Sequence, residues 1–263
     1  MQLNKDDYEE QRCLLNMHPE IVRIPTNRIM DKLDSLLEKK DFDGAERLLD
    51  NWVSEADTGN DRQGKLTMLN EKIGLFRKIS KEEKCLHAID SALSLVEELE
   101  FTDKVTGATT FINAATCYKA FGMADKAFPL YTKAKKIYEE LLKPDDDRLA
   151  ALYNNMALTL VELKEYDEAE KLYKKALEIL NQQKRPELEM AITYLNMADM
   201  MTAKLGPVDA EKYVNDYLDR AEKLLDTEDL PRDGYYAFVC EKCAPVFGYY
   251  GYFATKKKLE ERQ

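Results

Sequence analysis

Large and small apolar residues follow one another along the centre of the chain at helical spacing. Between Leu149 and Leu180, a large residue is followed one turn later by a small one, as at Tyr153 and Ala157. A second helical stretch then places a tyrosine between two alanines on one face. This pattern predicts two antiparallel helices that pack closely. The residues that carry it are Tyr153, Met156, Ala157, Leu160, Ala169, Tyr173 and Ala176.

The same pattern recurs with a period of about 42 residues. One copy runs from Phe111 to Ala134, another begins at Tyr194, and weaker copies precede them. The second helix of the copy at Tyr194 comes four residues late, so we expect an insertion in the turn from Leu205 to Asp209. A single helical hairpin cannot bury its apolar face, whereas stacked hairpins can. The recurrence therefore predicts an all-α repeat protein.

These repeats resemble the tetratricopeptide family. Their period exceeds the 34 residues usual for that family. In this length, and in the segment from Tyr153 to Ala157, they are similar to kinesin light chain repeats and to bacterial peptide-sensing regulators. The resemblance implies a tetratricopeptide-type α-solenoid of antiparallel helix hairpins forming a right-handed superhelix. It also implies that the first helix of each hairpin, helix A, lines a concave groove that binds peptides of partner proteins.

The breaker residues predict where the repeats begin and end. Residues 1–25 form an N-terminal cap or extension, because prolines delay the first hairpin until Thr26. Residues 26–263 form a single solenoid. We expect its repeats at 26–60, 64–102, 106–143, 148–184, 187–227 and, in part, 233–263.

Composition narrows the class of protein. Charged residues make up 34% of the chain, the net charge is -11, and there are only 10 Gly and 8 Pro. The first ten residues carry five charges and no apolar run, so we expect no secretory signal, no membrane span and a cytoplasmic location. The acidic balance argues against nucleic acid. Five cysteines, an odd number, predict free thiols in a reducing space.

One short motif has chemical potential. Cys240 and Cys243 form a CxxC, which occurs in redox and zinc proteins, but zinc needs four ligands and the only histidines are His18 and His87. A packing role is the default interpretation, and a redox or metal protein is the alternative. The sequence contains no phosphate-binding glycine loop, nucleophile elbow or HExxH pair. We therefore predict no enzyme, no cofactor and no metal.

Polar residues recur five positions before the large residue of successive helices A. In the family this row faces the groove, and an Asn there holds the backbone of a bound peptide, to which a carboxamide can both donate and accept. The alternative is that these residues tie neighbouring helices together. Three further residues lie beside the row. The candidate groove residues are Glu71, Asn113, Asn155, Asn196 and Glu241 in the row, with Asn154, Arg77 and Lys119 beside it.

The expected partner is a protein or peptide, with neutral or basic partners favoured by the acidic groove and chain. A scaffold or adaptor is the main prediction. An intracellular peptide receptor that regulates a partner protein is its closest alternative. Eight aromatic residues between Tyr235 and Phe253 suggest a homodimer through the C-terminal hairpin, unless they simply fill its interior.

Overall fold

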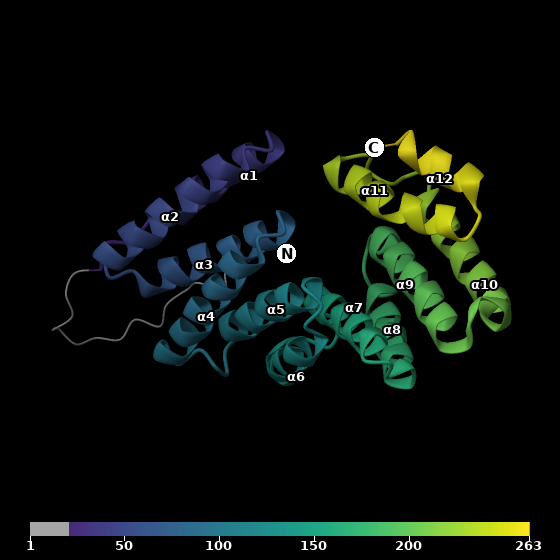
Figure 1. The fold of residues 1–263 in the computed structure, drawn as a ribbon, viewed down its shortest axis with the longest axis horizontal. Coiled ribbons are helices and arrows are strands. Elements are labelled where there is room, and N and C mark those ends of the chain that lie inside the picture. The colour runs from purple at the N-terminus through teal and green to yellow at the C-terminus, as the bar shows by residue number, and fades with distance from the viewer. Residues whose placement is uncertain (1–20, 263) are drawn as a thin grey trace. The chain divides into compact units, whose positions relative to one another are not determined.

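Helices are the only regular elements in the part of the chain that the computed structural model describes, residues 21–262 (Figure 1). Most of the predicted N-terminal cap, and His18, lie outside these residues. The all-α prediction is confirmed for residues 21–262. The helices are α1 (Thr26–Glu38), α2 (Phe42–Thr58), α3 (Arg62–Lys78), α4 (Glu82–Glu98), α5 (Val105–Ala120), α6 (Ala124–Leu141), α7 (Asp147–Glu162), α8 (Tyr166–Leu180), α9 (Glu187–Leu205), α10 (Pro207–Leu225), α11 (Gly234–Tyr249) and α12 (Phe253–Glu260).

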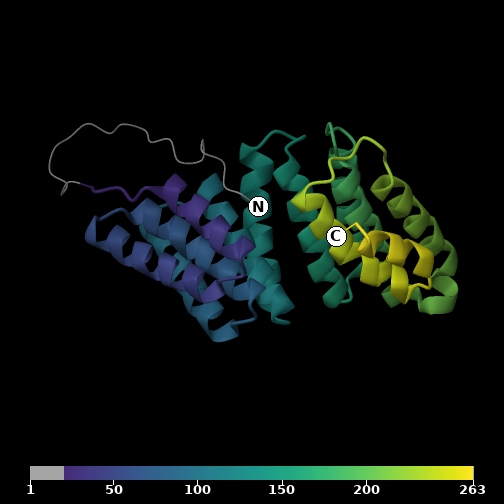
Figure 2. The ribbon, with the colours of Figure 1, turned by 90° about the horizontal axis from the view of Figure 1, so that it is seen from above.

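The helices pack in consecutive pairs within two compact units. The first unit ends at Leu141 and the second begins at Leu142. Hairpins α1/α2, α3/α4 and α5/α6 make up the first unit, and α7/α8, α9/α10 and α11/α12 the second. Figures 1 and 2 show each second helix, helix B, beside its helix A. None of the described helices is long and apolar enough to cross a membrane.

Cations of helix B cover the aromatic residues that mark helix A in the sequence. In three hairpins the cationic group lies 5.6–5.8 Å from the ring centroid, a distance typical of a cation–π contact. Each contact joins the two helices of one hairpin. The pairs are Lys133 with Phe111, Lys175 with Tyr153, and Arg220 with Tyr194.

Many helices end in the same tight turn. A residue with positive φ follows the helix, and the next amide donates to the carbonyl five residues earlier, as from Asp41 N to Leu36 O at 2.9 Å. This geometry satisfies carbonyls that the helix end would leave unpaired. Glycine is the usual residue there, but five of these positions hold other residues. They are Lys40, Asn60, Ser80, Glu100 and Lys164.

The extra residues of the fifth repeat lengthen its helices. The predicted insertion in the turn from Leu205 to Asp209 is wrong, because Leu205 ends α9 and Pro207 begins α10. Gly206 alone connects them, with a φ of 82° that suits glycine. The helices have 19 residues each, against 16 and 15 in α7 and α8.

The cysteines are not all free. Cys85 of α4 and Cys117 of α5 form a disulfide, whereas Cys240 and Cys243 are free and buried. The expectation of free thiols is therefore wrong for the first pair. The fold brings the side chains of Cys85 and Cys117 together from two helices, and an odd number of cysteines could not predict this pairing. The cysteine content consequently gives no argument for a reducing compartment.

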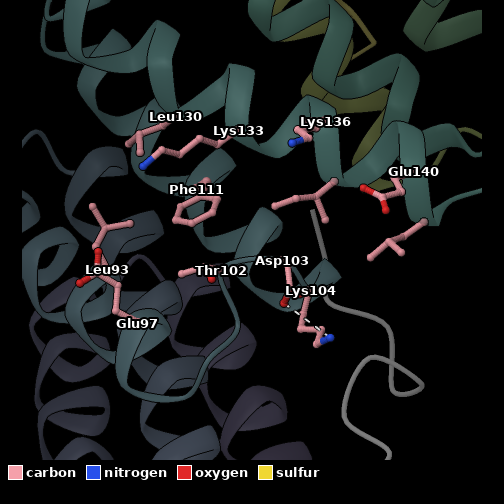
Figure 3. A pocket seen from close by; sticks show the side chains of 12 residues that line it. Leu93, Glu97, Thr102, Asp103, Lys104, Phe111, Leu130, Lys133, Lys136 and Glu140 are labelled. Carbon is pink, nitrogen blue, oxygen red and sulfur yellow. Dashed lines mark ion pairs between the residues drawn. The ribbon is translucent and has the colours of Figure 1, made fainter.

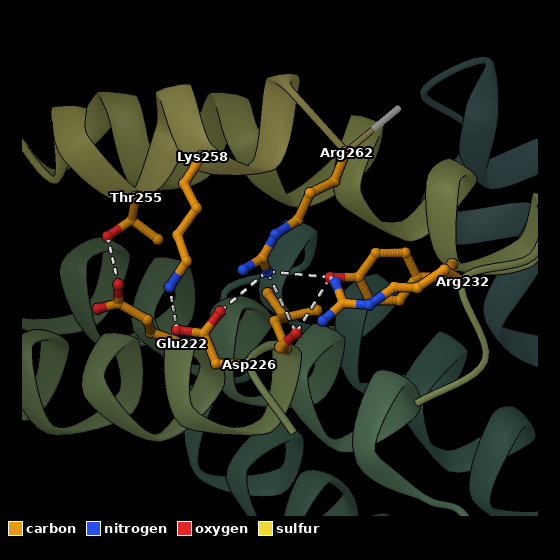
Figure 4. A network of polar contacts seen from close by, with 8 residues as sticks. Glu222, Asp226, Arg232, Thr255, Lys258 and Arg262 are labelled. Atoms are coloured by element: carbon orange, nitrogen blue, oxygen red, sulfur yellow. Dashed lines mark hydrogen bonds and ion pairs between the residues drawn. The ribbon is translucent and has the colours of Figure 1, made fainter. Parts of the chain in front are cut away.

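A polar network fastens α12 to the rest of the last hairpin and to α10 (Figure 4). Lys258 of α12 and Arg262, which follows α12, both pair with Asp226, which follows α10. Arg262 Nη1 also donates to the hydroxyl oxygen of Tyr236 at 2.9 Å, and Arg232 contacts the same hydroxyl. Burial opposes ionisation of Asp226, but the hydrogen bonds from Lys258 and Arg262 lower its pKa. Asp226 therefore anchors the short final helix.

Candidate functional site

Asn113 ties two helices A of the first unit together. Its side chain is half-buried on α5, and its Nδ2 donates to Oδ1 of Asn70 on α3 at 2.9 Å. Asn70 is only 5% exposed. Its own Nδ2 donates to the Leu66 carbonyl and to Oγ1 of Thr110, both at 3.0 Å. Asn113 therefore completes a buried polar network between α3 and α5.

Asn196 makes the equivalent bond in the second unit. Its Nδ2, on α9, donates to Oδ1 of Asn154 on α7 at 3.2 Å. The two ties span almost the same number of residues, 43 from Asn70 to Asn113 and 42 from Asn154 to Asn196. An Asn of the row thus bonds to the position one residue earlier in the preceding helix A.

Asn155 occupies the equivalent position on α7 but makes no such bond. Forty-three residues before it stands Ile112, which has no side-chain acceptor. Asn155 is half-buried on α7, and within residues 21–262 its carboxamide makes no hydrogen bond. Its two donors and its acceptor are therefore available to a ligand.

The remaining predicted residues differ in exposure and charge. Glu71 is half-buried on α3, and burial above all, with a smaller contribution from the charge of Asp34 on α1, raises the pKa of its carboxyl to about 7. At neutral pH this group can donate as well as accept. Arg77 is exposed at the end of α3, Lys119 is half-buried on α5, and Glu241 is exposed on α11. The first unit thus holds four of the predicted residues, and the second holds Asn154, Asn155, Asn196 and Glu241.

Two carboxylates of α9 accept hydrogen bonds from tyrosines at the two ends of the α11 region, Tyr235 inside α11 and Tyr250 directly after it. Asp199, one turn after Asn196, accepts from Tyr250 Oη at 2.8 Å, and Glu189 accepts from Tyr235 Oη at 3.0 Å. Burial raises the pKa of Asp199, which the Tyr250 bond partly opposes. Neither bond was predicted, because the sequence indicates only that acids and aromatic residues are abundant in this region. These bonds hold α11 against an acidic stretch of α9.

Tyr173 of α8 carries a buried hydroxyl without a hydrogen-bond partner among the described residues. In the matching residue of the preceding repeat, Tyr131, the hydroxyl oxygen lies within hydrogen-bond distance of Oγ1 of Thr116, at 2.9 Å. Leu158 stands where the corresponding threonine would be, so the bond is lost. Both tyrosine side chains are fully buried. The unpaired hydroxyl of Tyr173 therefore lowers the stability of the fold, whereas the bonded hydroxyl of Tyr131 does not.

The two cysteines of the CxxC motif lie inside α11. Cys240 is 0% exposed and Cys243 2% exposed. Burial raises the pKa of both thiols, that of Cys243 to about 12. A reactive or metal-binding cysteine requires a thiolate, which a raised pKa disfavours. Burial and pKa together favour the packing role.

The hairpins, their cation–π contacts and the asparagine ties define an α-helical repeat protein. Residues 147–223, which span α7, α8, α9 and most of α10, match the model of the tetratricopeptide repeat family. The resemblance noted in the sequence is thereby confirmed. No curated protein matches the chain.

Solved structures with the same fold have little sequence identity to the chain. BtubC (BKLC) from P. vanneervenii has a TM-score of 0.67 at 19% identity, over 79% of this chain and 84% of that chain. Kinesin light chain TPR-like repeats from Podosopora anserina score 0.55 at 12% identity, over 75% and 92%. NprR, in complex with its cognate peptide NprX, scores 0.57 at 17% identity, over 89% and 64%. The fold is therefore a tetratricopeptide-type solenoid of helix hairpins.

Proposed function

We propose that this chain is a non-catalytic scaffold or adaptor that binds a peptide segment of a partner protein on its helices A. The observation that carries the proposal is the unpaired carboxamide of Asn155, half-buried beside Asn154, which accepts the tie from Asn196. A carboxamide in such a place can pair with the N–H and C=O of a peptide whatever its side chains. The NprR structure, which has the same fold, contains a bound peptide.

The charges around this site favour a neutral or basic partner. Asp199 and Glu241 are exposed on α9 and α11, and Glu189 lies on α9 as well. The net charge of the chain, -11, has the same sign. Carboxylates of this kind attract cationic side chains and repel acidic ones. The groove residues of the first unit, Glu71, Asn113, Arg77 and Lys119, stay a prediction.

A pull-down that compares Asn155→Ala with wild type tests the proposal. If Asn155 holds a peptide backbone, its loss should weaken binding by about 1–3 kcal/mol, so captured partners should largely disappear. Asn181→Ala is the matched control, because Asn181 is exposed at the end of α8 in the same unit. Equal capture by both variants would refute the groove.

An intracellular peptide receptor that regulates a partner protein is the second candidate. The fold shared with NprR favours it, since that structure holds a cognate peptide. Both candidates use the same face, so the identity of the captured ligand separates them. Long proteins in the pull-down support a scaffold, and a short free oligopeptide supports a receptor. We also propose a cytoplasmic location, which imaging of a tagged chain tests.

Self-association through the terminal hairpin is a further part of the proposal. Phe238 is 49% exposed and Tyr249 76% exposed on α11. Thr193 and Met200 stand on α9 45 residues before Phe238 and Pro245, and both are 0% exposed. Phe238 and Pro245 thus lie exposed at positions whose counterparts in the preceding helix A are buried. Light scattering should detect a dimer that Phe238→Asp abolishes, and a wild-type monomer would contradict it.

A further inference from the structure

A cavity of about 690 Å³ lies among α4, α5 and α6 of the first unit (Figure 3). Leu93 and Glu97 line it from α4, Phe111 from α5, and Lys133 and Ile137 from α6. All of its lining residues belong to the first unit, whereas Asn155 belongs to the second. Its volume falls within the range of small-molecule sites, about 300–1,000 Å³.

The floor of the cavity is apolar. Phe111 is 6% exposed and Ile137 8% exposed, and Leu93 and Leu130 are half-buried beside them. The ammonium of Lys133 lies 5.8 Å from the centroid of the Phe111 ring. An apolar side chain of a ligand could therefore cover the floor while a charged group reaches the wall.

The walls carry charges of both signs, and two of them, Lys104 and Asp103, form an ion pair at 3.5 Å. Within residues 21–262, however, the side chains of Lys133 and Glu97 have no ion pair or hydrogen bond. Figure 3 shows them coming from opposite walls, on either side of Phe111. A cation and an anion held apart over an apolar floor match a ligand that carries the two opposite charges itself.

We propose that this cavity binds a zwitterion with apolar side chains, of the size of a dipeptide. The ligand carboxylate pairs with the ammonium of Lys133, and the ligand ammonium pairs with the carboxylate of Glu97. The apolar side chains cover Phe111 and Ile137. Recognition of both charges distinguishes this site from an apolar surface patch, because each charge of the ligand pairs with a wall residue of opposite sign.

Calorimetric titration of the whole chain with leucyl-phenylalanine tests the proposal. N-acetyl-leucyl-phenylalanine and leucyl-phenylalanine amide each lack one of the two charges. We expect saturable binding of the free dipeptide at millimolar concentration or below, and about tenfold weaker binding of each blocked analogue, which corresponds to about 1.4 kcal/mol.

Variants assign each charge to its residue. Glu97→Gln should bind the free and the N-acetylated dipeptide equally, and Lys133→Gln should bind the free dipeptide and its amide equally. Lys175→Gln is the control, because Lys175 makes the equivalent ring contact in the second unit without lining the cavity. Circular dichroism checks that each variant is folded. Absence of saturable binding, or blocked analogues that bind wild type as tightly as the free dipeptide, would overturn the proposal.

Discussion

Asn113→Ala and Asn155→Ala remove the same side chain from matching positions, yet the structure predicts opposite effects. Asn113→Ala deletes a donor 2.9 Å from Oδ1 of Asn70, which is 5% exposed. A buried acceptor left without a donor costs about 1–3 kcal/mol. Because Asn113 is half-buried, water reaches part of the gap, and we expect the lower part of this range, about 1–2 kcal/mol.

Asn155→Ala loses no hydrogen bond among the described residues. Alanine is the better helix former, by a few tenths of a kcal/mol up to about 0.7 kcal/mol. We therefore expect its free energy of unfolding to be unchanged or slightly increased. Partner binding by Asn155→Ala, in contrast, should weaken, because the Asn155 carboxamide is the one that the proposed ligand uses.

Urea unfolding gives the global free energy, but repeat proteins need not unfold in one step. Amide hydrogen exchange supplies the local measurement. In Asn113→Ala, protection should fall in α3 and α5, which the lost bond joins, and in Asn155→Ala the protection of α7 should be retained. If both variants lose the same stability, the unpaired state of Asn155 and the groove built on it are wrong.

Three further outcomes can be measured by unfolding. Tyr131→Phe should cost about 1 kcal/mol, because its hydroxyl is bonded, whereas Tyr173→Phe should be neutral or stabilising. Gly107→Ala should destabilise strongly, since the new Cβ would lie 1.8 Å from a backbone oxygen, while Gly74→Ala, with open space around it, should gain about 0.5–1 kcal/mol. Glu71 holds a proton in the folded chain up to a pKa of about 7, above its ordinary value of 4.5. Stability should therefore fall as the pH rises between these values, and Glu71→Gln should abolish that fall.

The helix hairpins could be predicted because their apolar spacing is a local property of the sequence. Tyr153 and Ala157 are buried on α7, and Tyr173 on α8, as the pattern indicates. The turns without glycine could not be predicted. Ser80 and Glu100 adopt positive φ, and the amide of the residue after each donates a hydrogen bond to the carbonyl five residues earlier.

The roles of the asparagines were harder to predict than their recurrence. Asn155 and Asn196 share one register, but the residues that stand 43 and 42 positions before them differ in type. They are Ile112 for Asn155 and, for Asn196, Asn154, which accepts its hydrogen bond. The difference can be read from the sequence only when each Asn of the row is compared with the residue one position before the row in the preceding helix A. The row by itself does not show it.

The single-residue connection at Gly206 shows how such a chain can change its length. Four residues correspond to little more than one helical turn, so adding them inside a hairpin hardly rotates the face that is buried. Ala210 and Ala221 of α10 are both 0% exposed, on either side of the added turn. Insertions of whole turns are therefore nearly silent in packing, whereas insertions of two residues would turn the apolar face toward solvent. Repeats of unequal length can thus descend from one another without rebuilding their cores.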